Sequence, residues 1–289
     1  GAITSNGEGV YAENRAANDD PSDPALGTNI DITTASINSV GHGIKVDNKG
    51  TGTVNVTVNG TITSGDVGVF VINEFGSGVT INTGAVSGED EGIGADNFGT
   101  GALIINATGA VFGRGDEGID AENQGTDLII TATSVSNTTD NNDAIAAVNE
   151  GSGVLSITTT GVVDGGQNGI DADNSGTDLI INAAIVLGGD YAIDAKNTGS
   201  GVLSITATGE VISTGSDAIF VINDGTDILI NTAKITADGR AIGAENKGSG
   251  EINITVNDAI TSGAGAPNID SDIAAAVYAK NSSAGTDIT

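Results

Sequence analysis

One pattern recurs about every 25 residues along almost the whole chain. Each copy places an Ile or Val four residues, and an Ala or Val two residues, before an Asn, as in HGIKVDNKG, EGIDAENQG and RAIGAENKG. A unit this short cannot bury its own apolar face, so successive copies are expected to stack on one another. The Asn residues that mark the copies are Asn14, Asn48, Asn73, Asn97, Asn123, Asn149, Asn174, Asn197, Asn223, Asn246 and Asn281.

Within each copy the apolar residues alternate with polar ones. Ile119 and Ala121 flank Asp120, and Ile170 and Ala172 flank Asp171. A period of two indicates a strand with one buried face. A Gly-containing turn follows, then a second alternating run such as VLSITAT, and then a shorter third run such as GEVISTG.

These features predict an all-β fold, a right-handed parallel β-helix (β-solenoid) of about eleven coils, with three short strands in each coil. The whole chain, residues 1–289, is expected to be a single β-solenoid with loop insertions near 15–29 and 262–272. Equivalent strands in adjacent coils would pair about 4.8 Å apart, which gives a rod roughly 50 Å long.

The turns after the Asn carry a second regularity. A GTD turn follows Asn123, Asn174 and Asn223, whereas a GSG or GTG turn, one residue longer, follows Asn97, Asn149, Asn197 and Asn246. The effective repeat in this part of the chain is therefore a pair of coils.

Composition narrows the classes of function. The chain has 38 acidic and 9 basic side chains, a formal net charge of −29, and no Cys. Such a surface repels nucleic acid, so no nucleic-acid partner is expected. No apolar run approaches the roughly 18 residues of a membrane span, so membrane insertion by this segment is not expected either.

The repeated Asn is expected to form a structural ladder. Inward-pointing amides at one level of every coil hydrogen-bond the next coil and the carbonyls of the turn. Carboxylates beside this ladder would point outward as a candidate cation stripe that attracts Ca²⁺, although the same residues also fit a plain solvated surface. The stripe consists of Asp47, Asp96, Glu122, Asp171, Asp173, Asp194 and Glu245.

Two further groups of residues are candidate binding sites. Arg114, Gly115 and Asp116 form an RGD tripeptide in a predicted turn, the setting in which integrin ligands present that motif. In three coils the outward positions beside the Asn are apolar instead of charged, which suggests a self-association face or cover by a neighbouring turn. The residues of this apolar face are Phe70, Ile72, Ala146, Val148, Phe220 and Ile222.

Signals of catalysis are weak. His42 is the only His, and no GxSxG, HExxH or P-loop motif occurs. The three Arg residues lie in different repeats, whereas polysaccharide lyases on this fold cluster basic residues beside their acids. We therefore expect no enzyme activity and no cofactor, with Ca²⁺ the one candidate ion.

The repeat style, seen in units such as GIDAENQGTDLIITATS, resembles the passenger region of bacterial autotransporter adhesins over most of residues 5–285. Related secreted β-solenoid surface proteins share this style. The resemblance implies secretion to the bacterial cell surface and a role in adhesion, aggregation or biofilm formation, with a host or neighbouring-cell surface protein, a glycan or a second copy as partner. The alternatives are a self-assembling surface-layer, filament or matrix protein and a carbohydrate-active β-helix enzyme.

Overall fold

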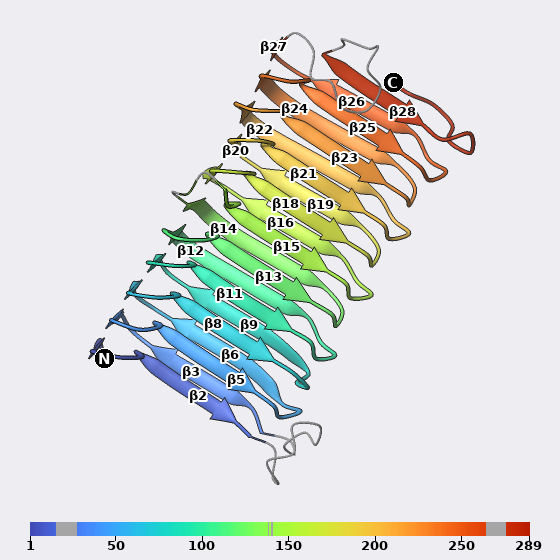
Figure 1. Ribbon diagram of the computed structural model, residues 1–289. Coiled ribbons are helices and arrows are strands. Elements are labelled where there is room, and N and C mark those ends of the chain that lie inside the picture. Colours follow the sequence, from blue (N-terminus) through green and yellow to red (C-terminus); the bar gives the residue numbers. More distant parts are fainter. Residues whose placement is uncertain (16–27, 138, 140, 264–275) are drawn as a thin grey trace.

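A computed structural model describes residues 1–15, 28–137, 139, 141–263 and 276–289. The chain winds into a parallel β-solenoid of about nine regular turns of about 25 residues, and the described ranges contain strands but no helix (Figure 1). The two termini lie at opposite ends of the stack. The predicted all-β solenoid is confirmed. The right-handed sense of the winding stays a prediction, as does the assignment of residues 1–289 to one domain.

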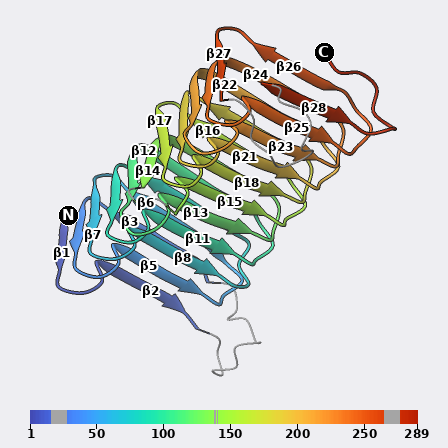
Figure 2. The same cartoon turned by 45° about the horizontal axis from the view of Figure 1, so that its top comes forward.

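Eleven strands that end on the repeated Asn form one parallel sheet, called here the Asn sheet. Each pairs with its equivalent in the next coil, Asn opposite Asn, from Asn14↔Asn48 to Asn246↔Asn281. Figure 2 shows these strands as one row along the rod. They are β2 (Val10–Asn14), β5 (Ile44–Asn48), β8 (Val69–Asn73), β11 (Ile93–Asn97), β13 (Ile119–Asn123), β15 (Ile145–Asn149), β18 (Ile170–Asn174), β21 (Ile193–Asn197), β23 (Ile219–Asn223), β25 (Ile242–Asn246) and β28 (Val277–Asn281).

The remaining seventeen strands form a second sheet. Four coils run the second and third predicted strands together into one long strand, so they contain two strands instead of three. Two of these long strands show a register shift, between Ala107 and Ala110 and between Ala207 and Glu210. The four long strands are β12 (Leu103–Gly113), β14 (Leu128–Asn137), β22 (Leu203–Ser213) and β24 (Ile228–Ala237).

The other coils keep the second and third strands separate, as the sequence predicts. These strands are β1 (Ile3–Ser5), β3 (Ile30–Thr34), β4 (Ile37–Ser39), β6 (Thr53–Val58), β7 (Ile62–Ser64), β9 (Gly78–Thr83), β10 (Val86–Gly88), β16 (Leu155–Thr159), β17 (Val162–Gly165), β19 (Leu179–Ala183), β20 (Ile185–Gly188), β26 (Ile252–Val256) and β27 (Ile260–Ser262).

The core is a column of small aliphatic layers. Ile119 and Ala121 of the Asn sheet are fully buried, as are Leu203 and Ile205 of the second sheet, in agreement with the alternation in the sequence. Each layer is thin, but stacking makes the apolar column continuous along the rod, so no coil has to bury its surface alone.

Side-chain hydrogen bonds link nine of the eleven residues of the predicted Asn ladder, from Asn14 to Asn223. From Asn14 to Asn197 each amide nitrogen donates to the side-chain oxygen of the Asn one coil further on, over distances of 2.6–3.1 Å. The amides of Asn223, Asn246 and Asn281 donate to backbone carbonyl oxygens instead. The interior members of the ladder are buried. The same amides also donate to carbonyl oxygens of the following turn, such as Asn97 Nδ2 to the Gly101 oxygen. These contacts satisfy polar groups that burial would otherwise leave unpaired.

The alternating turns are explained by a contact between paired coils. The Asp of each GTD turn accepts a hydrogen bond from the backbone N–H of the residue directly after the GSG turn in the next coil, for example Val202 N to Asp178 Oδ1 at 2.9 Å. Asp127 and Asp227 make the equivalent contact. A Cβ on Gly201 would collide with this same Asp178 oxygen, so the second Gly of the GSG turn leaves space for the carboxylate.

The two predicted loop insertions fall largely on residues 16–27 and 264–275, which lie outside the described residues.

Candidate functional site

The outer face of the Asn sheet carries the predicted cation stripe in two columns instead of one. Asp47, Asp96, Glu122, Asp173 and Glu245 stand one position before the Asn, whereas Asp171 and Asp194 stand three positions before it. Strand pairing places Asp96 beside Glu122 and Asp171 beside Asp194. Apolar or basic residues separate the rest: Ile72, Val148, Lys196 and Ile222 occupy the intervening positions.

The adjacent carboxylates influence one another electrostatically. Burial raises the pKa of Asp171 to about 7 and that of Asp194 to about 6, and nearby carboxylates, Asp194 among those acting on Asp171, add to the rise. Asp96 is raised to about 6 by burial and by the charges of Asp120 and Glu122. Within the stripe, like charges are therefore crowded in two short stretches, around Asp96 and around Asp171.

The tightest acidic cluster was not predicted from the sequence. Glu91, Glu117 and Asp120 each bring one carboxylate oxygen within 4.8 Å of the others, and this is the one group of metal-ligating side chains at such spacing within the described ranges. Burial raises the pKa of Glu91 to about 7 and that of Glu117 to about 8, with Asp116 adding to the rise at Glu117. Carboxylate oxygens are the ligands that Ca²⁺ prefers. Binding of Ca²⁺ stays a prediction.

This cluster has a recognisable sequence origin. Glu91 and Glu117 each stand six residues before an Asn of the ladder, in the turn that enters a strand of the Asn sheet. Gly94 lies beside the Glu91 carboxylate, and a Cβ at Gly94 would collide with it. The signal was a pair of acids at one repeat position in consecutive coils, directly before the strands that carry Asp96 and Glu122 of the stripe.

The same turn position has a structural role elsewhere. Asp143 accepts a hydrogen bond from Asn168 N, and Asp217 accepts one from Arg240 N, each in the next coil and each at 2.8 Å. Arg240 also binds the second Asp217 oxygen through Nε and a terminal nitrogen, at 2.9 and 2.6 Å. The Asp217 side chain is only 3% exposed, so this is a buried ion pair that ties two coils together.

The predicted apolar face is partly covered from within the chain. The ring of Phe70 stacks on His42 at 5.6 Å, and Phe220 lies beside Tyr191 at 5.8 Å. Phe70, Ile72, Ala146, Phe220 and Ile222 are half-buried, and Val148 is 38% exposed. Phe70 pairs with Gly94, and Phe220 pairs with Gly243. A Cβ on either Gly would crowd its ring, so the missing side chains make room for the aromatic groups.

The RGD tripeptide lies in a turn, as expected. Arg114 and Gly115 are exposed and Asp116 is half-buried. Arg114 Nε is 3.0 Å from a carboxylate oxygen of Glu89 in the preceding coil, so the guanidinium already has an acidic partner.

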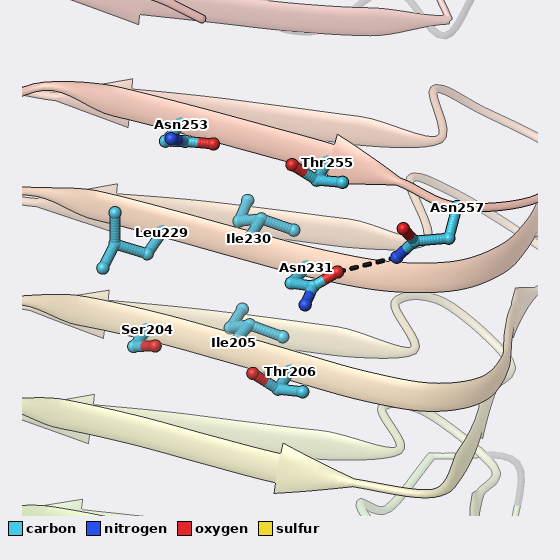
Figure 3. Close-up of a pocket in the computed structure, with 9 residues that line it drawn as sticks. All are labelled: Ser204, Ile205, Thr206, Leu229, Ile230, Asn231, Asn253, Thr255 and Asn257. Carbon is cyan, nitrogen blue, oxygen red and sulfur yellow. Dashed lines mark hydrogen bonds between the residues drawn. The ribbon is translucent and has the colours of Figure 1, made fainter.

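The outer face of the second sheet holds a shallow groove. Its side chains come from the strands β22, β24 and β26 of three successive coils, and from the turn after β26 (Figure 3). The groove has a volume of about 420 Å³ and is lined by Ser204, Ile205, Thr206, Leu229, Ile230, Asn231, Asn253, Thr255 and Asn257. Asn257 Nδ2 donates to Asn231 Oδ1 at 2.7 Å across the groove wall. No side chain in this lining is charged.

In comparisons with known proteins, no family model, no curated protein and no solved structure matches the chain. Within the described ranges no helix is long and apolar enough to cross a membrane.

Proposed function

We propose that this chain is a non-enzymatic adhesin or stalk segment, secreted and displayed on the bacterial cell surface, that mediates adhesion, aggregation or biofilm formation. The observation that supports this most directly is the unbroken stack. Eleven strands keep one register along the rod, and the chain enters and leaves at opposite ends. A rod of this kind holds one end at an anchor while its faces contact partners further away.

The distribution of charge supports a binding surface in preference to a catalytic one. Six basic side chains in the described ranges form ion pairs, and each pairs with a different carboxylate: Arg15–Glu13, Lys49–Glu74, Arg114–Glu89, Lys234–Glu210, Arg240–Asp217 and Lys280–Glu245. The basic groups are thus spread along the rod, whereas a lyase needs several beside its catalytic acid. The likeness to autotransporter passengers in repeat style points in the same direction.

Surface display tests the proposal. A non-adherent bacterium carrying the chain on a neutral anchor should settle faster and bind abiotic or cell surfaces better than the same strain carrying the anchor alone. Soluble chain added in excess should reduce that binding. Equal adhesion by both strains, together with release of reducing sugar from polysaccharide by the purified chain, would instead favour the enzyme alternative.

A self-assembling surface-layer, filament or matrix protein is the second candidate. The exposure of Val148 and the apolar residues in coils three apart favour it, because exposed apolar side chains are unusual on so acidic a surface. Sedimentation at rising ionic strength distinguishes the two functions. Wild type should assemble as charge repulsion is screened, and a Phe70→Ser/Phe220→Ser double variant should remain monomeric. Monomers in both cases would remove this candidate.

A further inference from the structure

One column on the outer face of the second sheet is built only from Thr and Asn. Strand pairing aligns it over ten successive coils, with neighbours about 4.8 Å apart. Its members are Thr33, Thr57, Asn82, Asn106, Thr131, Thr158, Asn182, Thr206, Asn231 and Thr255.

The column two residues earlier is also almost free of charge. It mixes hydroxyl, amide and aliphatic side chains, and its single carboxylate, Asp31, lies at the end nearest the N-terminus. The other members are Asn55, Thr80, Ile104, Ile129, Ser156, Ile180, Ser204, Leu229 and Asn253. Together the two columns form a nearly neutral strip along the outer face of the second sheet. This strip distinguishes that face from the acidic outer face of the Asn sheet, on a chain with 38 acidic residues.

The groove in Figure 3 lies at the C-terminal end of this strip and has hydrogen-bonding capacity to spare. Within the described part of the chain, the side chains of Ser204, Thr206, Asn253 and Thr255 make no hydrogen bond to other protein groups. Asn231 uses its oxygen for Asn257 and leaves its amide nitrogen open. Leu229, 36% exposed, supplies an apolar surface between the polar columns.

The chemistry of the groove specifies the class of ligand. Hydroxyls and amides both donate and accept, which suits a ligand rich in hydroxyl groups. The lining has no cation for an anionic ligand, and the net charge of −29 repels one at longer range. The regular spacing lets a chain of repeated units continue along the strip. A volume of about 420 Å³ is within the range of sites that hold small ligands.

We propose that the groove binds a neutral polysaccharide, with Ser204, Thr206, Asn231 and Asn253 hydrogen-bonding its hydroxyl groups and Leu229 packing on the C–H face of a sugar ring. This assignment rests on the proposed adhesin function, for which it names the ligand.

Affinity electrophoresis of the whole chain through gels containing dextran, galactomannan or soluble β-glucan tests the assignment, with alginate as the anionic comparison. At least one neutral polymer should retard the protein, alginate should not, and added salt should change the retardation little. Thr206→Val and Asn231→Asp should each weaken binding about tenfold, the equivalent of one hydrogen bond. Asn231→Asp keeps the acceptor for Asn257 and the shape of the side chain, so the fold is retained.

Gln167→Glu is the matched control, because it makes the same amide-to-carboxylate change at an exposed turn away from the groove. Retardation by no neutral polymer, or equal weakening by Gln167→Glu and Asn231→Asp, would overturn the proposal. A dimer that Asn231→Asp abolishes, without retardation by any polymer, would also overturn it and make the groove a contact between copies. If displayed cells adhere while the purified chain binds no neutral polymer, the ligand assignment fails and the adhesin function stands. If the purified chain binds a neutral polymer while displayed cells do not adhere, the ligand assignment stands and the adhesin function fails.

Discussion

The Asn ladder should contribute measurably to stability at each of its interior steps. Asn149 accepts from Asn123 Nδ2 at 2.8 Å and donates to Asn174 Oδ1 at 2.9 Å, and its side chain is fully buried. Asn149→Ala removes both links. Each net hydrogen bond is worth about 1 kcal/mol, and the stranded partners add a desolvation cost, so we expect a loss of about 2–4 kcal/mol.

Each stranded partner keeps one other hydrogen bond. Asn123 Nδ2 keeps a bond to the Thr126 oxygen at 3.2 Å, and Asn174 Oδ1 keeps one from Gly176 N at 3.3 Å. These remaining bonds are long, which places the expected loss below the sum for fully orphaned groups. In a repeat protein the loss acts mainly on the coils that flank the substitution.

Urea unfolding followed by far-UV circular dichroism measures the change, and hydrogen exchange localises it to coils near Asn149. Asn182→Ala is the matched control because Asn182 is exposed on the outer face of β19 and should cost less than about 0.5 kcal/mol. If both variants unfold at the same urea concentration, the ladder is not a source of stability and the reasoning fails.

Three further results are expected. Asp217→Ala should lower the free energy of unfolding in urea by about 3–5 kcal/mol, because it leaves the buried guanidinium of Arg240 without its partner. The control Asp224→Ala, at an exposed turn, should change it by almost nothing. Similar losses in both variants would show that the ion pair is dispensable. Because the folded-state pKa of Glu117, about 8, lies above its ordinary value of 4.5, its contribution to stability is complete below about pH 4.5 and is lost as pH rises through about 8. Tm should therefore rise as pH falls from about 9 to about 5, and Glu117→Gln should flatten that rise; an unchanged slope would refute the assignment. Gly201→Ala should displace the Asp178 carboxylate and leave the backbone N–H of Val202 unpaired, which costs about 1–3 kcal/mol. Tm should fall by several degrees for each kcal/mol lost. A variant with the wild-type Tm would contradict the close approach of Gly201 to Asp178.

The period, the strand faces and the ladder were predictable because each rests on one repeated position. Because apolar and polar residues alternate along the strand, Ile119 and Ala121 face the core whatever path the turns take. The cluster of Glu91, Glu117 and Asp120 was not predictable in the same way, because two of its members lie in turns whose path the alternation does not determine.

The groove was missed for a different reason. Ser204, Thr206 and Asn231 read individually as an ordinary solvated strand face, and only strand pairing shows that they stand beside one another. The fusion of second and third strands in four coils likewise depends on local bending at the turn between them, for which the sequence pattern offers no marker.

The contact between GTD and GSG turns affects how such a rod can change length. A coil ending in GTD offers a carboxylate to its successor, and the successor receives it where it has Gly. Deleting a GSG coil or inserting a GTD coil would place GTD on GTD, so that a side chain would stand where the carboxylate needs space. Loss or gain of two coils together keeps the match. Genetic duplication and recombination in this part of the chain are therefore expected to add or remove about 50 residues at a time, changing the reach of the rod in steps of about 10 Å.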